Sequence, residues 1–148
     1  MLLRTFAFAV LVILCGCVSP GGLTVGEVDR PLSELQHIAA KSLPLGLRTT
    51  SANGREFFSN YFVAAGRKFK AAEKLRERKY AQIQVLGDRR PYKIQVYVQN
   101  ERTDAASQTG YSNVGTDLGL AKVIKRRVQQ QLNKRREDLN IIDDFRVF

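Results

Sequence analysis

The residues of this chain that could do chemistry are mostly its arginines and lysines. The chain has 24 of them against 14 acidic residues, and the excess lies in two stretches. Residues 67–93 include ten basic residues and three acids, and residues 122–136 include seven basic residues and no acid. Guanidinium groups match the geometry of phosphates and carboxylates. The two stretches therefore predict a surface that attracts an anionic partner.

Six arginines in adjacent pairs are the candidate anion-binding residues. They are Arg89, Arg90, Arg126, Arg127, Arg135 and Arg136. The first pair is expected at the tip of a hairpin and the other two on the last helix. A solvated basic face with no partner is an equally simple alternative.

Catalytic and metal-binding patterns are absent from the sequence. It contains no Gly-rich phosphate loop, no His-Glu-x-x-His, no Cys pair at metal spacing and no Ser flanked by glycines at elbow spacing. His37 is the only histidine, and a lone histidine is usually a packing or surface residue. Asp143 and Asp144 are adjacent, so in a strand they would face opposite ways. We expect no enzyme, no cofactor and no metal; a hydrolase of unknown type using scattered carboxylates is the least favoured alternative.

Residues 1–16 have the pattern of a signal peptide for export. Arg4 precedes an apolar run from Phe6 to Leu14, which is short of the roughly 20 apolar residues that cross a bilayer. The run closes with Leu14-Cys15-Gly16-Cys17, which resembles the lipobox of bacterial lipoproteins. In that motif an aliphatic residue stands three positions before an invariant cysteine and a small residue directly before it. The alternative is an ordinary signal peptide that leaves Cys17 as a free thiol.

The resemblance implies that Cys17 carries a lipid and becomes the first residue of the mature chain. By similarity to enterobacterial lipoproteins, Val18 in place of Asp implies the outer membrane, on its periplasmic face, with the inner membrane or the cell surface as alternatives. The mature chain would then be anchored in the membrane without spanning it. It would have no thiol left, and the loss of Arg4 with every acid kept lowers the formal charge from +10 to +9.

The mature chain is expected to be a lipidated tether over residues 17–28, followed by a single domain over residues 29–148. Apolar residues at helical spacing predict a helix from Leu32 to Leu43. Asn53-Gly54 predicts a turn between two strands at residues 47–50 and 56–63. Strict alternation of apolar and polar residues predicts an antiparallel hairpin of residues 80–86 and 92–98.

The last third of the chain is expected to contain a polar loop and then a long helix. The loop covers residues 100–115, and Thr116 is the expected cap of the helix that follows. The tail from residue 141 onward suits a short strand or a segment packed on the sheet. The predicted fold class is α+β: a two-layer sandwich in which an antiparallel sheet of three to four strands is covered by the N-terminal and C-terminal helices. Small helix-and-sheet domains of this kind are similar to those of lipoproteins that assist outer-membrane assembly, which supports no function by itself.

The expected function is that of a non-catalytic, lipid-anchored envelope lipoprotein that serves as an accessory or binding subunit of an outer-membrane or periplasmic assembly. It would dock through an exposed aromatic strand region, residues 57–62, and an uncovered sheet edge. The alternative is binding of an anionic polymer or lipid, such as lipopolysaccharide, peptidoglycan or phospholipid, by the basic helix and hairpin tip. Only the second should weaken steeply with salt. Tyr80, Tyr92 and Tyr97 lie among basic residues, as in sheets that stack bases, but export argues against a nucleic-acid partner.

Overall fold

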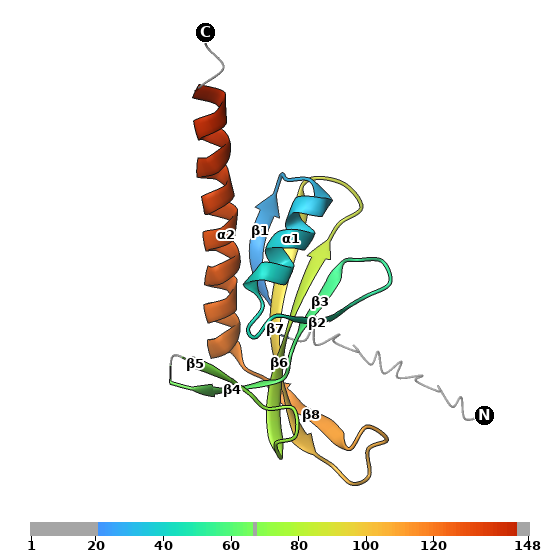
Figure 1. The fold of residues 1–148 in the computed structure, drawn as a ribbon. Helices are drawn as coiled ribbons and strands as arrows, with labels where there is room; N and C mark the ends of the chain where they lie inside the picture. Colours follow the sequence, from blue (N-terminus) through green and yellow to red (C-terminus); the bar gives the residue numbers. More distant parts are fainter. Residues whose placement is uncertain (1–20, 67, 145–148) are drawn as a thin grey trace, which may run out of the picture.

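The described part of the chain forms one antiparallel sheet and two helices (Figure 1). The computed structural model describes residues 21–66 and 68–144, with side chains through residue 134. In chain order the elements are β1 (Leu23–Val28), α1 (Leu32–Ser42), β2 (Leu47–Thr50), β3 (Glu56–Ser59), β4 (Phe62–Ala65), β5 (Lys68–Ala71), β6 (Glu77–Leu86), β7 (Tyr92–Thr103), β8 (Tyr111–Thr116) and α2 (Leu118–Asp144).

Strands β6 and β7 form the centre of the sheet. They pair along the whole of β6, from Glu77 opposite Arg102 to Leu86 opposite Lys93. The sheet order is β1-β7-β6-β3-β2; β4 joins β6 and β5, and β8 joins β7. Because β6 occupies one side of β7, β1 and β8 share the other side. The predicted hairpin of residues 80–86 and 92–98 is confirmed, and both of its strands are longer than predicted.

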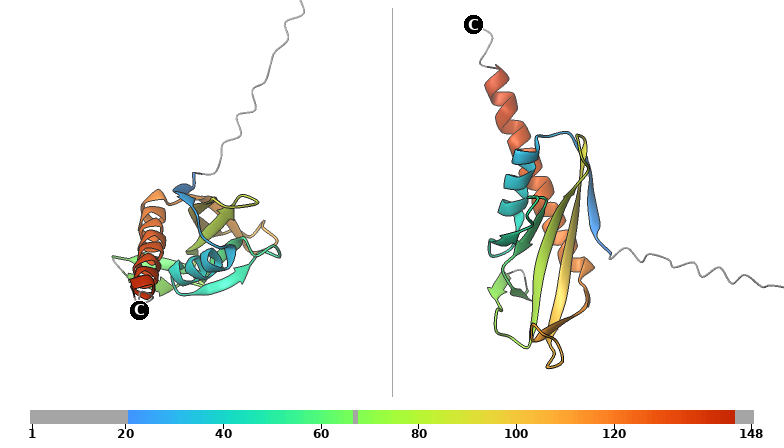
Figure 2. Two further views of the ribbon diagram at one scale, coloured as in Figure 1. Left: turned by 90° about the horizontal axis from the view of Figure 1, so that it is seen from above. Right: turned by 90° about the vertical axis from the view of Figure 1, so that its right-hand side faces the viewer.

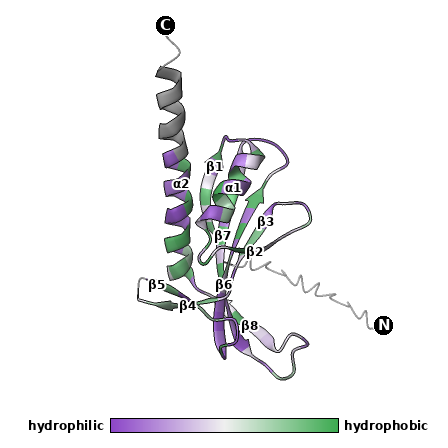
Figure 3. Ribbon diagram, viewed as in Figure 1, coloured by the Kyte–Doolittle hydropathy of each residue, from purple (hydrophilic) through white to green (hydrophobic). Residues whose placement is uncertain are grey.

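Both helices lie on one face of the sheet, as the two views in Figure 2 show. The core between them consists mainly of Leu35, Ile38 and Ala39 of α1, Ala121, Ile124 and Val128 of α2, and Phe57, Phe62, Ala81, Ile83, Val85, Ile94, Val96 and Val98 of the sheet. Alternate residues of β6 and β7 point into this core, as the pleat requires. In Figure 3 hydrophobic and hydrophilic colours accordingly alternate on both helices, each of which has one face on the core, while the far ends of β6 and β7 are hydrophilic.

The predicted fold class is wrong in its sheet. The structure has eight strands in one antiparallel sheet and is mostly sheet, where a two-layer sandwich with three to four strands was expected. Four of the additional strands are short or lie at an edge, and such strands carry no long apolar alternation in the sequence. Strand β8 is an example, because four of its six residues are exposed and none is buried.

The chain enters the sheet earlier than predicted. Residues 17–28 were expected to be a tether, but Leu23–Val28 form β1 and pair with β7, from Leu23 opposite Val96 to Val28 opposite Tyr92. A register shift between Thr24 and Gly26 interrupts the strand, so its apolar residues do not alternate regularly. The folded part of the chain therefore includes these six residues.

The predicted polar loop of residues 100–115 is mostly strand. Strand β7 continues to Thr103 and β8 begins at Tyr111, which leaves a connection of residues 104–110. Helix α2 follows at Leu118 and is capped by Asp117, not by the expected Thr116, which is the last residue of β8. The helix includes Asp143 and Asp144, so the start of the expected strand-like tail is helical; residues 145–148 lie outside the described residues.

Helix α2 is the longest element of the protein. Its 27 residues correspond to about 40 Å at 1.5 Å per residue, and Figure 1 shows its C-terminal turns extending past the sheet. None of the helices in the described part of the chain combines the length and the apolar character needed to cross a membrane.

A one-residue bulge between β3 and β4 decides which aromatic side chains are buried. Phe58 lies opposite Gln82 and Phe62 opposite Lys79, so four steps along one chain match three along β6. The extra residue moves Phe62 into the core, where it is fully buried, and places Tyr61 on the other face. The expected exposed aromatic region of residues 57–62 is therefore wrong, because Phe57 and Phe62 are core residues.

Candidate functional site

The face of the sheet opposite the helices carries polar and aromatic side chains where the other face carries the apolar core. On β6, for example, Tyr80, Gln82 and Gln84 are half-buried, while the alternate residues between them are fully buried in the core. Among the described residues no helix covers this surface, which we call the open face. Its main residues are Glu27, Arg48, Glu56, Phe58, Tyr61, Arg78, Tyr80, Gln82, Gln84, Lys93, Gln95, Tyr97, Gln99, Glu101, Tyr111 and Asn113.

Arg78 is the central cation of the open face. Its guanidinium carbon lies 3.5 Å from the ring centroid of Tyr61 and 3.5 Å from that of Tyr111, so the cation is held between two tyrosine rings. Its Nε donates to Oε2 of Glu101 across the β6–β7 pair at 2.7 Å. The hydroxyl of Tyr111 donates to the carbonyl oxygen of Leu75 at 3.1 Å, and this hydrogen bond fixes the position of the Tyr111 ring. Stacking on the two rings and the charge-assisted hydrogen bond to Glu101 together hold the Arg78 guanidinium in one position.

Arg48 extends the same arrangement toward the edge of the sheet. Its guanidinium carbon lies 4.1 Å from the ring centroid of Tyr61 and 5.6 Å from that of Tyr80. Its Nη1 donates to the Tyr61 hydroxyl at 2.7 Å and its Nε to the carbonyl oxygen of Ser59 at 3.1 Å. The rings of Tyr61 and Tyr80 meet edge to face with centroids 6.0 Å apart. We call Arg48, Tyr61, Arg78, Tyr80 and Tyr111 the open-face cluster.

The hydroxyl of Tyr80 is harder to ionise than an ordinary tyrosine. Burial raises its pKa, the nearby carboxylate of Glu101 and the hydroxyl of Tyr61 raise it further, and Arg48 opposes them. Tyr80 therefore stays neutral well into the alkaline range.

The bulge between β3 and β4 positions the open-face cluster. Ser59 is fully buried there, and its Oγ accepts from the backbone N–H of Ala81 at 2.9 Å and donates to the carbonyl oxygen of Asn60 at 2.8 Å. This closes the gap in the strand ladder and turns Tyr61 toward Arg48 and Arg78. A strict alternation puts Tyr61 in the core, so the sequence pattern could not identify this residue. The tyrosine-rich and arginine-rich composition of residues 48–111 was the only available signal.

The predicted hairpin-tip residues lie apart from the open-face cluster. Arg89 and Arg90 are exposed in the link between β6 and β7. Arg90 makes a long ion pair with Asp29, with Nη1 3.9 Å from the carboxylate oxygen, which joins the link to the β1–α1 connection. Arg55 approaches the same link from the strand side and donates to the carbonyl oxygen of Gly87.

Only two of the four predicted arginines of α2, Arg126 and Arg127, have side chains in the described part of the structure. Arg126 is exposed, whereas Arg127 is half-buried with its guanidinium carbon 4.8 Å from the ring centroid of Phe69 in β5. Their neighbours Arg135 and Arg136 lie in the helix, but their side chains are outside the described part, and so is Cys17. Arg127 therefore packs on β5, while its neighbour Arg126 is exposed to solvent.

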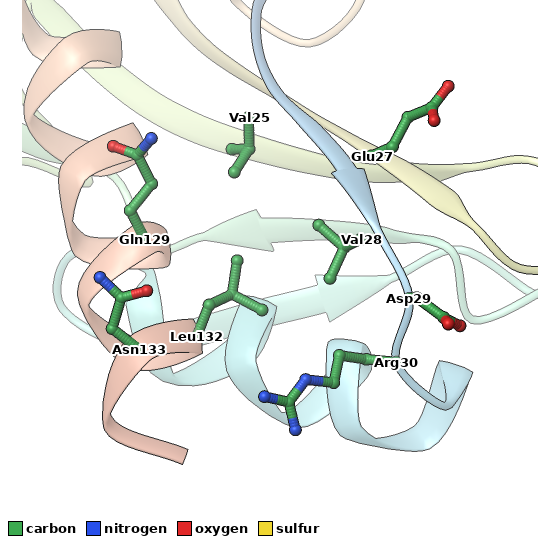
Figure 4. A pocket seen from close by; sticks show the side chains of 8 residues that line it. All are labelled: Val25, Glu27, Val28, Asp29, Arg30, Gln129, Leu132 and Asn133. Atoms are coloured by element: carbon green, nitrogen blue, oxygen red, sulfur yellow. The ribbon is translucent and has the colours of Figure 1, made fainter. Parts of the chain in front are cut away.

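A cleft of about 800 Å³ lies between β1 and α2. Figure 4 shows Val25 and Val28 of β1 and Leu132 of α2 pointing into it, while Glu27 and Asp29 point away. These three apolar side chains also pack against the core, so the cleft is an open margin of the core. Gln129 and Asn133 form its rim on the helix. No pair of acidic side chains converges in it, and nothing in it provides a nucleophile.

The described residues contain no group of three or more His, Cys, Asp or Glu side chains that could hold a metal ion. His37 is exposed on α1, away from the open face. The pKa of Asp117 is shifted for a structural reason: burial raises it, but the N–H of Leu120 and the ammonium of Lys79 outweigh burial and hold it below the ordinary value. The open-face cluster is thus the candidate site, as a binding surface.

The comparisons with known proteins add no assignment to this surface. No protein-family model matches the chain, and no curated protein or solved structure shows significant similarity to it.

Proposed function

We propose that the protein is a non-catalytic, lipid-anchored envelope subunit whose open face docks on a protein partner. The observation that carries this proposal is the open-face cluster. Tyrosine and arginine are enriched at the positions that dominate protein interfaces. Here their side chains are already ordered by stacking and by Glu101, so little conformational entropy remains to be lost when a partner binds.

The charge balance of the open face favours a protein over an anionic polymer. The whole chain has a formal charge of +10, but the open face has three cations, Arg48, Arg78 and Lys93, against three carboxylates, Glu27, Glu56 and Glu101. Two of these cations are already paired: Arg78 with Glu101 at 2.7 Å and Lys93 with Glu27 at 3.8 Å. A locally neutral surface gives little counterion release, which is the main driving force for binding a polyanion.

Attachment to the envelope is supported by the sequence. The signal-like residues 1–16 and the lipobox-like end at Cys17 favour a lipid anchor, and Val18 favours the periplasmic face of the outer membrane. A subunit that is held at a membrane and carries a neutral recognition face suits an accessory role in an envelope assembly.

Site-specific photocrosslinking in the native envelope tests the docking proposal. A benzophenone amino acid is placed at Tyr111 on the open face or, as a matched control, at His37, which is exposed on the helix side. We expect one defined protein adduct from position 111 and none from position 37. Tyr80→Ala should lower the adduct yield at least about tenfold, since interface tyrosines contribute about 2 kcal/mol or more. Equal adducts from both positions, or only lipid or wall fragments, would contradict the proposal.

A further inference from the structure

The described chain begins beside the first turn of α2. A Cβ atom added to Gly21 would lie 3.6 Å from Cδ2 of Leu118, and one added to Gly22 would clash with the ring of Tyr97. The chain thus enters the fold at the β7 edge, between the start of β1 and the end of β8. Cys17 precedes Gly21 by four residues, and four residues span at most about 14 Å. A lipid on Cys17 would therefore hold Gly21, which lies beside the start of α2, within this distance of the bilayer surface.

One flank of α2 runs away from this entry point. Leu118, Lys122, Lys125 and Arg126 lie at positions i, i+4, i+7 and i+8, which share one side of a helix. We call these four residues the anchor-side stripe. Farther along the same side, Gln129 and Asn133 face the cleft beside β1 (Figure 4), which places the stripe on the β1 side of the helix. The stripe extends about 12 Å along the helix axis, a distance comparable to the longest possible span from Cys17 to Gly21.

The stripe has the composition of a membrane-surface contact. Leu118 is 49% exposed at its near end, and Lys122 and Arg126 are exposed beyond it. No acidic residue occurs between Leu118 and Lys134. The nearest acid, Asp117, is already paired with Lys79 at 2.9 Å, and no ion pair to the three stripe cations is found among the described side chains. Clusters of basic residues beside a membrane anchor bind anionic lipid headgroups.

We propose that the anchor-side stripe is the surface with which the lipid-anchored domain lies on an anionic phospholipid bilayer. This inference rests on the lipid anchor of the proposed function and adds the orientation of the domain.

The test uses the full lipidated protein, with one cysteine introduced and labelled with a fluorophore. Position 129 continues the stripe, whereas Val123 lies on the opposite flank but nearer the anchor along the helix. In vesicles of phosphatidylcholine and phosphatidylglycerol that contain a headgroup-spin-labelled lipid, we expect strong quenching at position 129 and weak quenching at position 123. Proximity to the anchor alone predicts the opposite order.

A charge comparison separates the stripe from the overall basicity of the chain. The variant Lys122→Gln, Lys125→Gln, Arg126→Gln should lose most of the quenching at position 129, since each basic charge changes binding to an anionic surface about fivefold. The control Lys41→Gln, Lys70→Gln, Lys74→Gln loses the same charge from exposed positions elsewhere and should keep it. In vesicles of phosphatidylcholine alone, position 129 should no longer be quenched more strongly than position 123.

The outcomes separate this inference from the proposed function. Equal quenching at positions 129 and 123, or retained quenching in the stripe variant, in a protein whose mass shows the acyl chains, would overturn the orientation alone. A mass without acyl chains would overturn both the anchor and the orientation. The docking proposal is tested separately by the photocrosslinks from position 111.

Discussion

Asp117 has two functions in the protein. Its Oδ1 accepts from the backbone N–H of Leu120 at 2.9 Å, which caps α2, and its Oδ2 accepts from Nζ of Lys79 at 2.9 Å, which ties the helix start to β6. We expect Asp117→Ala to lower the free energy of unfolding by about 1–2 kcal/mol near neutral pH. Asp117→Asn keeps a capping oxygen and loses only the ion pair, so it should cost about 0.5–1 kcal/mol in urea denaturation.

The pH dependence of this contribution follows from the lowered pKa of Asp117. A carboxyl group whose pKa is lower in the folded state stabilises the protein above its unfolded pKa of about 3.9, and this stability is lost as the pH falls through the folded value. The difference in unfolding free energy between the wild type and Asp117→Asn should therefore be constant near neutral pH and shrink below about pH 4. A difference that grows on acidification would refute this account of the ion pair.

The pKa of Tyr80 tests the electrostatic contacts of the open-face cluster. Because the carboxylate of Glu101 is one cause of the raised pKa of Tyr80, Glu101→Gln should move this pKa down toward its ordinary value. Glu77→Gln is the matched control: it removes an exposed acid from β6, the strand of Tyr80, and this acid does not contribute to the shift. Carbon-13 NMR of the labelled tyrosine rings, recorded against pH, resolves Tyr80 from the other four tyrosines. An equal shift in both variants would contradict the assignment.

At the scale of the elements, the sequence predicted those that face the core with a regular period. The central hairpin was predictable because Ala81, Ile83 and Val85 alternate with polar residues over a long strand. Helix α1 was predictable from its apolar spacing. Strand β8 was not, because an exposed edge strand needs no apolar residues, and β1 was not, because a register shift breaks its alternation.

The candidate site was less predictable than the fold. The open-face cluster depends on a contact between Arg78 and Tyr111, which are far apart in the sequence, and cation–aromatic stacking imposes no sequence spacing. It also depends on the bulge at Ser59, which reverses the faces of the residues that follow it. The aromatic composition and the Asn53-Gly54 turn predicted a single strand at residues 56–63, and the exposed aromatic region expected at residues 57–62 was therefore misplaced.

The contribution of the bulge to stability can be tested by removing the hydroxyl of Ser59. Ser59→Ala leaves the backbone N–H of Ala81 without its acceptor in a fully buried position, so we expect a loss of about 1–3 kcal/mol in the free energy of unfolding. Ser33→Ala, at an exposed position of α1, is the control and should change stability by less than about 0.5 kcal/mol. Chemical denaturation compares the two; similar values would mean that the hydrogen bond at the bulge contributes little.

The packing of the chain where it enters the sheet can be tested by replacing two neighbouring glycines, one at a time, with alanine. A Cβ atom at position 22 would lie 2.3 Å from the ring of Tyr97, whereas one at position 21 would make an ordinary contact with Leu118 at 3.6 Å. Gly22→Ala must therefore displace Tyr97 or the start of β1, at a cost of about 1–3 kcal/mol, and Gly21→Ala should be close to neutral. Faster hydrogen exchange in β1 of Gly22→Ala than of Gly21→Ala would locate the effect; equal exchange would refute it.

At the scale of the whole molecule, the positive charge is distributed unevenly over the surface. The open face is locally neutral, with three cations and three carboxylates, while α2 from Leu118 to Lys134 carries only positive charge. One chain thus presents a recognition surface of mixed polarity and a separate basic flank. The two surfaces should respond differently to ionic strength, because screening weakens contacts that depend on net charge and leaves desolvated aromatic contacts nearly unchanged.

Salt therefore distinguishes the two surfaces in the same protein. Between about 0.05 M and about 0.5 M salt, we expect the photocrosslink from position 111 to change by less than about twofold, because stacked rings and short-range hydrogen bonds do not depend on net charge. Over the same range the stronger quenching at position 129 than at position 123 should be lost, because it depends on three solvent-exposed or half-exposed cations. A crosslink that falls in step with the quenching would mean that membrane orientation controls docking, and the two surfaces would then act as one.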